Sequence, residues 1–145
     1  YYASSAFQIN LTTNRVFRDP SAWYHIVLAI DTTQGTAANR VKIYVNGVQE
    51  TSFATSVYPN QNLELNVNNT VQHRLGQYHG DAHPFKSYLA ETHFIDGAAK
   101  APSDFGETNS DTGQWIPKEY EGSYGTFCIF WQMVLGDETS SLEYL

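Results

Sequence analysis

The sequence predicts an all-β protein, an antiparallel two-sheet sandwich of the jelly-roll type with one long covering loop and at most a short helical turn. Two observations predict this class. Short apolar or alternating runs recur along the 145 residues, with turn-forming residues between them. The sequence also contains no heptad pattern, no internal repeat and no long helical pattern. The spacing of the runs corresponds to about seven to nine strands.

Two neighbouring segments give the clearest strand signals. Residues 23–30, WYHIVLAI, form a mainly aromatic and aliphatic run. Residues 41–45 alternate apolar and polar side chains with a period of two, which is typical of a half-buried strand. Asn46 and Gly47 follow, and this dipeptide most readily adopts the two positive φ angles of a type I′ turn. We therefore expect a hairpin whose returning arm is residues 48–53.

Other runs predict the remaining strands. They are residues 7–11, 15–18, 63–67, 71–75, 88–95 and 126–135. Residues 54–62 and 77–84 are expected to be loops, because they combine proline, asparagine, glycine and other polar residues.

The strand pattern weakens over residues 98–125, which we expect to form the covering loop. Residues 102–106 predict one helical turn, with Ser103 available as its N-cap. Residues 111–113 predict a tight turn. The apolar anchors of this loop are expected to be Trp115, Ile116 and Tyr120.

Composition excludes several classes of function. The net charge is −7, and the eight basic residues are scattered singly. A nucleic-acid or anionic-membrane partner would require clustered lysine and arginine, so we expect neither. No apolar run reaches the length of a membrane span, so no membrane insertion is expected. Cys128 is the sole cysteine, which excludes an internal disulfide and favours a small buried apolar side chain over a nucleophile.

Three motifs carry a family resemblance. The order WYHIVxAIDTT, NRVKIYVNG and FxxYLAExHFIDG resembles the concanavalin A-like, laminin-G-like domain. The later run PSxFGETNSDTGQWIPKxY resembles a version of this domain found in marine phage and virus virion proteins. The resemblance covers residues 19–125 and implies a single jelly-roll domain over residues 1–145, with a polar C-terminal tail at 136–145. The family's strands upstream of Phe7 are largely missing, which fits either a fragment or a sandwich that a partner chain completes.

Catalysis is not expected. Glycoside hydrolysis normally needs two carboxyl groups placed across the scissile bond. The cleaving relatives carry an ExDxxE run on one strand, and this sequence has none. Glu91 stands alone on its expected strand. Glu119 and Glu121 would share a face if extended, roughly 7 Å apart at Cα, but they flank Tyr120 in what reads as a solvated loop.

Metal binding is a weaker hypothesis than an exposed polar loop. His79, Asp81 and His83 lie within five residues, but three ligands fall short of the four of a structural zinc site. Family analogues often hold calcium at a sandwich rim through aspartates. By that analogy the residues to test for calcium are Asp31, Asp81 and Asp96, although none matches a defined calcium motif.

Glycan binding requires an aromatic platform beside amide or carboxylate groups. Three sets of loop residues meet this requirement. They are Tyr58 with Asn60, Tyr78 with His79 and Asp81, and Trp115 with Asn109 and Asp111. For Trp115, a buried anchor of the covering loop is slightly favoured over a platform, and for Tyr78 the structural and platform interpretations are even. His25 and His73 fall within strand patterns and are expected to be structural, and His93 is expected to bond to Glu91 on the same strand face.

We therefore expect a non-catalytic binding or adhesion module that recognises glycans at a virion or extracellular surface. The alternative is a purely structural virion or filament protein, because tyrosine-rich surfaces and the apolar strand expected at 126–135 suit self-assembly. Either reading predicts a homo-oligomer or a place in a larger assembly. A β-glucan hydrolase is the least favoured reading.

Overall fold

A computed structural model of the chain describes residues 2–3, 6–19, 21–67, 69–71, 73, 88–125 and 133–134. Its strands are β1 (Tyr2–Ala3), β2 (Ala6–Phe7), β3 (Asn10–Thr13), β4 (His25–Ile30), β5 (Val41–Val45), β6 (Val48–Gln49), β7 (Phe53–Val57), β8 (Gly106–Thr108), β9 (Trp115–Pro117) and β10 (Met133–Val134). Its described helices are two short 3₁₀ turns, η1 (Ala37–Asn39) and η2 (Pro102–Asp104). No helix among these residues is long and apolar enough to cross a membrane.

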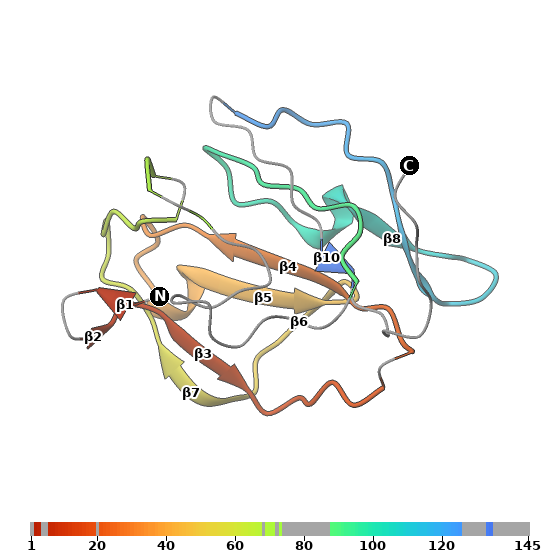
Figure 1. Ribbon diagram of the computed structural model, residues 1–145, viewed down its shortest axis with the longest axis horizontal. Coiled ribbons are helices and arrows are strands. Elements are labelled where there is room, and N and C mark those ends of the chain that lie inside the picture. The colour runs from red at the N-terminus through yellow and green to blue at the C-terminus, as the bar shows by residue number, and fades with distance from the viewer. Residues whose placement is uncertain are drawn as a thin grey trace.

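The strands are antiparallel and arranged around one central sheet (Figure 1). That sheet has four strands in the order β10-β4-β5-β6. The pairs β1-β2, β3-β7 and β8-β9 form separate two-stranded sheets. The described residues thus confirm a mostly β protein without α-helices. A complete two-sheet jelly roll is not formed by these small sheets, so the sandwich stays a prediction.

The expected central hairpin is confirmed. Strand β4 pairs with β5 in a register that sets Leu28 opposite Ile43. Asn46 and Gly47 have φ angles of 49° and 80°, as a type I′ turn requires. Asn46 also holds the start of β4, because its backbone N–H donates to the His25 carbonyl and its side-chain Oδ1 accepts from the His25 N–H, both at 2.8 Å.

One face of β4 supplies the core. His25, Val27 and Ala29 are buried and alternate along the strand, as side chains on one face of a sheet must. Val27 packs against the buried rings of Phe105 and Tyr120. Partly buried Tyr44, Ile95 and Tyr124 surround this cluster. This cluster is therefore largely aromatic, whereas the other buried hydrophobic residues of the described chain are aliphatic, namely Ala29, Val41, Val45 and Leu65.

The arm that returns from the hairpin serves two sheets. It was expected to be one strand over residues 48–53, with a loop from residue 54. Instead β6 ends at Gln49, and the chain crosses to pair as β7 with β3, where Leu11 faces Ser56. Such a change of sheet is how sandwich corners are made. The expectation of a loop over residues 54–57 is therefore wrong.

Three other expected strands are irregular. Residues 15–18, 63–67 and 88–95 form no ladder. In the last of these, Glu91 has a φ of 48°, which is incompatible with an extended strand. Leu65 is nevertheless buried, whereas Val67 in the same pattern is 37% exposed, so the alternation indicated burial only in part and did not indicate pairing. Residues 71 and 73 belong to no strand, and the rest of 71–75 lies outside the described residues.

The expected helical turn is confirmed as η2, but its cap is not Ser103. The N-cap position is Ala101, and the Asp104 carboxylate accepts a hydrogen bond of 2.9 Å from the Ala101 N–H. The acidic side chain in the first turn therefore satisfies the free backbone donor. Trp115 and Ile116, expected as loop anchors, lie on β9. Of the expected strand at 126–135, the structure describes β10, which pairs with the start of β4.

Candidate functional site

A cleft of about 910 Å³ lies beside β4. All six residues of β4 and the following residues 31–33 contribute to its lining. The described residues of the other walls come from segments 63–67 and 92–100, with His73 and Phe105. The lining is mostly apolar, with polar groups toward both ends of β4. Concave sites of this character are the usual places for small ligands.

Asp31 lies at the C-terminal end of β4 and is fully engaged by its own loop. Its Oδ1 accepts from the Thr33 hydroxyl at 2.6 Å and from the Thr33 N–H at 3.0 Å. Its Oδ2 accepts from the Gln34 side chain at 2.6 Å. The Thr33 hydroxyl, then Gln34 and the Thr33 amide, hold the pKa of Asp31 below its ordinary value. Asp31 is thus an ionised carboxylate that shapes the loop.

Arg40 secures the same end. Its guanidinium and Nε donate to the carbonyls of Gln34, Gly35 and Pro59, at 2.8, 2.8 and 2.9 Å. Pro59 is fully buried, so this contact fixes the loop that carries Tyr58 and Asn60 beside residues 31–35. Two further bonds tie the loops together, from the Asn62 N–H to the Thr32 carbonyl and from the Gln61 side chain to the Thr33 carbonyl.

The candidates Tyr58 and Asn60 therefore lie at the polar end of β4. Tyr58 is half-buried and Asn60 is exposed. Neither lines the cleft. The structure places this pair next to the cleft end without turning it into the cavity.

The N-terminal end of β4 is built from rings. His25 is 6% exposed and lies 5.7 Å from the Trp115 ring, centroid to centroid. Both His25 ring nitrogens and Trp115 Nε1 are buried without a hydrogen-bond partner in the described part of the chain. Burial, and secondarily the charge of His93, lower the pKa of His25. The imidazole is therefore neutral near pH 7.

Two glycines form the seat of the Trp115 indole. A Cβ added at Gly47 would lie 2.4 Å from Trp115 Cζ3, and one added at Gly106 would lie 2.6 Å from Trp115 Nε1. Side chains cannot approach that closely, so only glycine permits this packing. The indole lies on these two backbones instead of forming an open platform. The packing favours the anchor interpretation of Trp115.

Asn109 and Asp111 occupy a different feature, the turn between β8 and β9 at the far right of Figure 1. Asn109 Oδ1 accepts from the N–H groups of Asp111 and Thr112, at 2.8 and 3.0 Å. Gly113 completes the turn with a φ of 70°, which confirms the expected turn over residues 111–113. The amide of Asn109 shapes this turn while Trp115 packs at the hairpin base. The three residues do not form one site.

The metal candidates are not brought together. Asp31 binds its own loop, and the Asp96 N–H donates to the Tyr124 carbonyl. Among the described residues, no group of three His, Cys, Asp or Glu side chains is placed to hold an ion. Tyr78, His79, Asp81 and His83 lie outside the described residues.

His93 contacts the core instead of its expected partner. Its Nδ1 lies 2.9 Å from the Tyr124 hydroxyl, and its ring is stacked on the Tyr124 ring with an interplanar angle of 4°. Phe105 and Tyr120 flank the same imidazole. Glu91, the expected partner, is exposed on its left-handed turn. The structure assigns His93 to the aromatic core.

Two exposed aromatic residues were missed by sequence reasoning. Trp23 was expected inside a strand, but it precedes β4 and is 52% exposed. Phe17 was expected on a short strand and is 40% exposed in an irregular loop. Their position in the sequence could have indicated this exposure, because both residues lie near the turn-forming Asp19. An aromatic residue next to a turn is a better candidate for a platform than one inside an alternating run.

The chain matches one protein-family model. The model described as the concanavalin A-like lectin/glucanases superfamily matches residues 2–103. The chain belongs to this superfamily. No curated protein and no solved structure matches it significantly. Because the superfamily name covers both sugar-binding and sugar-cleaving proteins, membership alone does not choose between them.

The positions of the carboxylates help to distinguish sugar binding from sugar cleavage, because cleavage normally needs two carboxyl groups across the bond. The described lining of the cleft contains two carboxylates, Asp31 and Glu64. Asp31 is engaged by three donors, and Glu64 is exposed. Glu119 and Glu121 are exposed on either side of buried Tyr120 and are not among these lining residues.

Proposed function

We propose that this superfamily domain is a non-catalytic carbohydrate-binding module at a virion or other extracellular surface. The cleft beside β4 is the observation that carries the proposal. It combines about 910 Å³ of space with an apolar lining and polar ends, in a chain of the lectin/glucanase superfamily. Sugar rings require both kinds of surface, because they have apolar C–H faces and many hydroxyls.

The residues that line the cleft supply both the apolar surface and the hydrogen-bonding groups that a sugar ring requires. Leu28 projects from β4 with 58% of its surface exposed and offers an apolar face to a sugar ring. Thr33 and Glu64 are exposed in the lining and offer hydrogen bonds to sugar hydroxyls. Lys100, which lies 5.8 Å above the Tyr120 ring, adds a donor at the opposite wall.

The state of Asp31 supports binding over hydrolysis. A general acid for glycoside cleavage needs a carboxyl group whose pKa is raised, so that it holds a proton near neutral pH. The hydrogen bonds from Thr33 and Gln34 shift the pKa of Asp31 in the opposite direction. Its oxygens are also occupied by the loop. We therefore assign Asp31 a structural role at the rim of the cleft.

The surface context rests on the run at residues 102–120, which resembles virion proteins. The family match ends at residue 103, so this part of the proposal stands on that resemblance. We also propose that the protein acts as a homo-oligomer or within a larger surface assembly, as display of binding modules requires multivalency for avidity.

A purely structural assembly role is the second candidate. Exposed apolar side chains favour it, notably Val48, which is 62% exposed on β6. Strand β6 is also the last strand of the central sheet in the described residues. Apolar edge strands pair readily with other chains. In this reading the apolar surface binds copies of the chain and no sugar.

A glycan array with and without calcium tests the proposal, using two matched variants. Leu28→Asp places a charge in the cleft, and Val48→Asp places the same charge on an equally exposed side chain outside it. We expect wild-type protein and Val48→Asp to bind the same glycans and Leu28→Asp to lose about tenfold or more in affinity. Binding to no glycan under either condition, with a stable multimer in solution, would support assembly alone. Release of reducing sugar from β-glucan that is lost in Glu119→Gln would overturn the non-catalytic assignment.

A further inference from the structure

The histidines that the structure describes all line the cleft. They are His25, His73 and His93. Imidazole is the side chain whose charge ordinarily changes between pH 5 and 8, so the cleft carries groups that respond to mild acid. His73 is half-buried, whereas His25 and His93 are packed among aromatic rings. Because a buried charge is costly, acid should change the structure mainly through the packed pair.

His25 is enclosed in its uncharged state. Its ring is 6% exposed, and both ring nitrogens are buried without a hydrogen-bond partner in the described part of the chain. A charged imidazole has two N–H donors, and both would remain unsatisfied in this packing. The closed packing therefore excludes the proton, and His25 can bind it only after the side chains around it have moved away.

The groups around His25 disfavour a positive charge on it. Trp115 covers it from β9, and the indole Nε1 is a second buried donor instead of an acceptor. The charge of His93, added to burial, also lowers the pKa of His25. The other titratable and charged side chains on the elements packed here are Lys42 and Tyr44 of β5, and Asp96, Lys100, Glu107, Lys118, Glu119, Tyr120, Glu121 and Tyr124. Glu107, Glu119 and Glu121 are exposed.

Trp115 connects His25 to one side of the cleft. The indole lies on the Gly106 backbone, where an added Cβ would be 2.6 Å from Nε1. Gly106 directly follows Phe105, which lines the cleft. The Phe105 ring in turn lies 5.5 Å from the His93 ring, centroid to centroid. Displacing Trp115 from His25 therefore displaces residues that form the cleft.

Residues 92–117, here called the covering wall, are held on β4 by side-chain packing. Phe105 packs against Val27, and Trp115 lies beside His25. Strands β8 and β9 form a sheet of their own, and no strand of the wall that the structure describes pairs with the central sheet. The wall therefore depends on packing contacts that a charge on His25 would disrupt.

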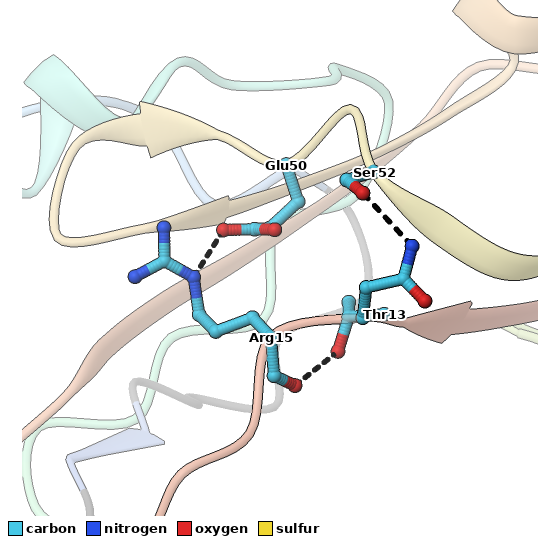
Figure 2. Close-up of polar contacts among 5 residues, drawn as sticks. Thr13, Arg15, Glu50 and Ser52 are labelled. Atoms are coloured by element: carbon cyan, nitrogen blue, oxygen red, sulfur yellow. Dashed lines mark hydrogen bonds and ion pairs between the residues drawn. The ribbon is translucent and has the colours of Figure 1, made fainter.

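The junction between the central sheet and the β3-β7 sheet is held by polar contacts that involve no histidine. The Glu50 N–H donates to the Ile43 carbonyl at 2.8 Å. Two residues later, the Ser52 carbonyl accepts from the Asn14 N–H at 3.1 Å. Figure 2 shows the Arg15 guanidinium paired with the Glu50 carboxylate at the same junction. We therefore expect this junction to stay closed when the wall separates.

We infer that the covering wall is an acid-labile gate of the cleft, which separates from β4 when His25 takes up a proton while the sheets stay folded. The open state binds the proton with the ordinary histidine pKa of about 6.5, and the closed state excludes it. The equilibrium constant for opening should therefore rise about tenfold between pH 7.5 and pH 5.5. The opening does not depend on the proposed function. Its consequence does, because a saccharide that contacts both sides of the cleft would then be released.

Hydrogen exchange of the Trp115 indole N–H measures the opening by NMR. This group is buried and exchanges when the wall separates, and comparison with N-acetyl-tryptophanamide at the same pH converts its rate into an opening constant. The Glu50 amide reports the opening of the central sheet in the same way. We expect the opening constant of Trp115 to exceed that of Glu50 at every pH, and to rise about tenfold from pH 7.5 to pH 5.5.

Two matched variants assign the pH dependence to one histidine. His25→Phe keeps a ring against Trp115 and removes the titrating group, so its opening constant should not change with pH. His73→Phe removes a half-buried histidine elsewhere in the lining and should keep the wild-type dependence. Thermal unfolding shows whether each variant folds. If His25→Phe does not fold, His25→Leu supplies the same comparison.

The outcomes separate this inference from the proposed function. Equal opening constants for Trp115 and Glu50 would mean that wall and sheet open together, and would overturn the gate. A wild-type constant that does not change with pH, or a dependence that survives in His25→Phe, would also overturn it. If the wild-type protein binds no glycan but shows the expected exchange, the proposed function alone is wrong. If it binds a glycan and the exchange of Trp115 is independent of pH, the gate alone is wrong.

Discussion

The two ends of β4 are built on different physical principles, although they lie only roughly 17 Å apart along one strand. At the C-terminal end, Arg40 and Asp31 bind loop carbonyls, hydroxyls and amides around fully buried Pro59. At the N-terminal end, Trp115 lies on Gly47 and beside His25, and three ring nitrogens have no partner in the described residues. The first end is held together mainly by hydrogen bonds from charged side chains. The other is tightly packed and unsatisfied in hydrogen bonds.

This difference predicts which changes each end tolerates. The packed end should resist any added volume, because neighbouring backbone leaves no room for it. The polar end should accept added volume at an open position such as Gly35, and it should be sensitive to the loss of a donor or acceptor. The two ends should also differ in how they treat a charged side chain. The polar end stabilises the ionised carboxylate of Asp31, and the packed end destabilises the ionised imidazole of His25.

Gly47→Ala should give the largest effect. The new Cβ would overlap the Trp115 ring, and φ at this position is 80°, which alanine adopts at a cost. We expect the free energy of unfolding to fall by about 3 kcal/mol, the sum of roughly 1–2 for the backbone and 1–3 for overpacking, discounted for relaxation. Urea unfolding followed by tryptophan fluorescence measures this change.

Three other glycines separate the two contributions to that effect. Gly106→Ala adds the overlap without a positive φ, and Gly113→Ala adds the positive φ of 70° in open space. Gly35→Ala adds neither. We expect losses of about 2, about 1 and less than about 0.5 kcal/mol in that order. A Gly47→Ala variant no less stable than Gly113→Ala would show that the Trp115 ring moves freely, and the packed end would lose its distinction.

Arg40→Ala should give the next effect, at the polar end. Three carbonyls would lose a charged donor, and the loop around buried Pro59 would lose its tie to residues 31–35. We expect a loss of about 2 kcal/mol in the free energy of unfolding. Arg40→Lys should recover only part of it, because an ammonium cannot reproduce the fork of a guanidinium. Arg18→Ala, at an exposed arginine with no hydrogen bond to a described residue, is the matched control and should be nearly neutral.

Acidification should destabilise the packed end. Because the pKa of His25 is lowered in the folded protein, the unfolded chain binds the proton more readily, and stability rises with pH across the interval between the two pKa values. The contribution is complete above the ordinary histidine pKa of about 6.5 and is lost as the pH falls from there toward the folded value. Unfolding curves between pH 5 and 8 measure this slope, at a salt concentration near 0.15 M. His25→Leu should flatten it, and an unchanged slope in that variant would contradict this role.

The smallest effect is expected from Asp31. Its pKa is held below the ordinary value, so its contribution to stability is present above the unfolded pKa and is lost as the pH falls through the folded one. Carboxyl chemical shifts in an NMR titration should show a midpoint below that of a model aspartate. Thr33→Val removes the hydroxyl that contributes most and should raise the midpoint. No change on that substitution would mean that the Gln34 side chain and the Thr33 amide hold the carboxylate without the hydroxyl.

The sequence allowed the hairpin of β4 and β5 to be predicted because its signals are local. Asn46 and Gly47 determine the turn within two residues, and alternation reports which side chains are buried. The strands expected at 63–67 and 88–95 are not observed, because strand pairing depends on residues that are distant in sequence. Alternation correctly indicated that Leu65 is buried, but it carries no information on whether a backbone finds a partner to pair with.

The candidate site was less accessible to sequence reasoning. The engagement of Asp31 follows from the threonine and glutamine two and three residues later, a local pattern that could have been recognised. The burial of Trp115 depends on two glycines 68 and 9 residues away. The exposure of Trp23 likewise depends on how the β3–β4 loop is fixed by Glu50 and Ser52, which are distant in sequence.

The returning arm from β6 to β7 has a consequence for how the domain opens. Within three residues the Glu50 N–H donates to the Ile43 carbonyl in the central sheet, and the Ser52 carbonyl accepts from Asn14 beside β3. One short segment is thereby a shared edge of two sheets, and the Glu50 carboxylate ties the same junction to Arg15. Neither sheet can fray at this point without releasing the other. We expect the amide protons of Glu50 and Asn14 to exchange with solvent at similar rates, as members of one cooperative opening unit.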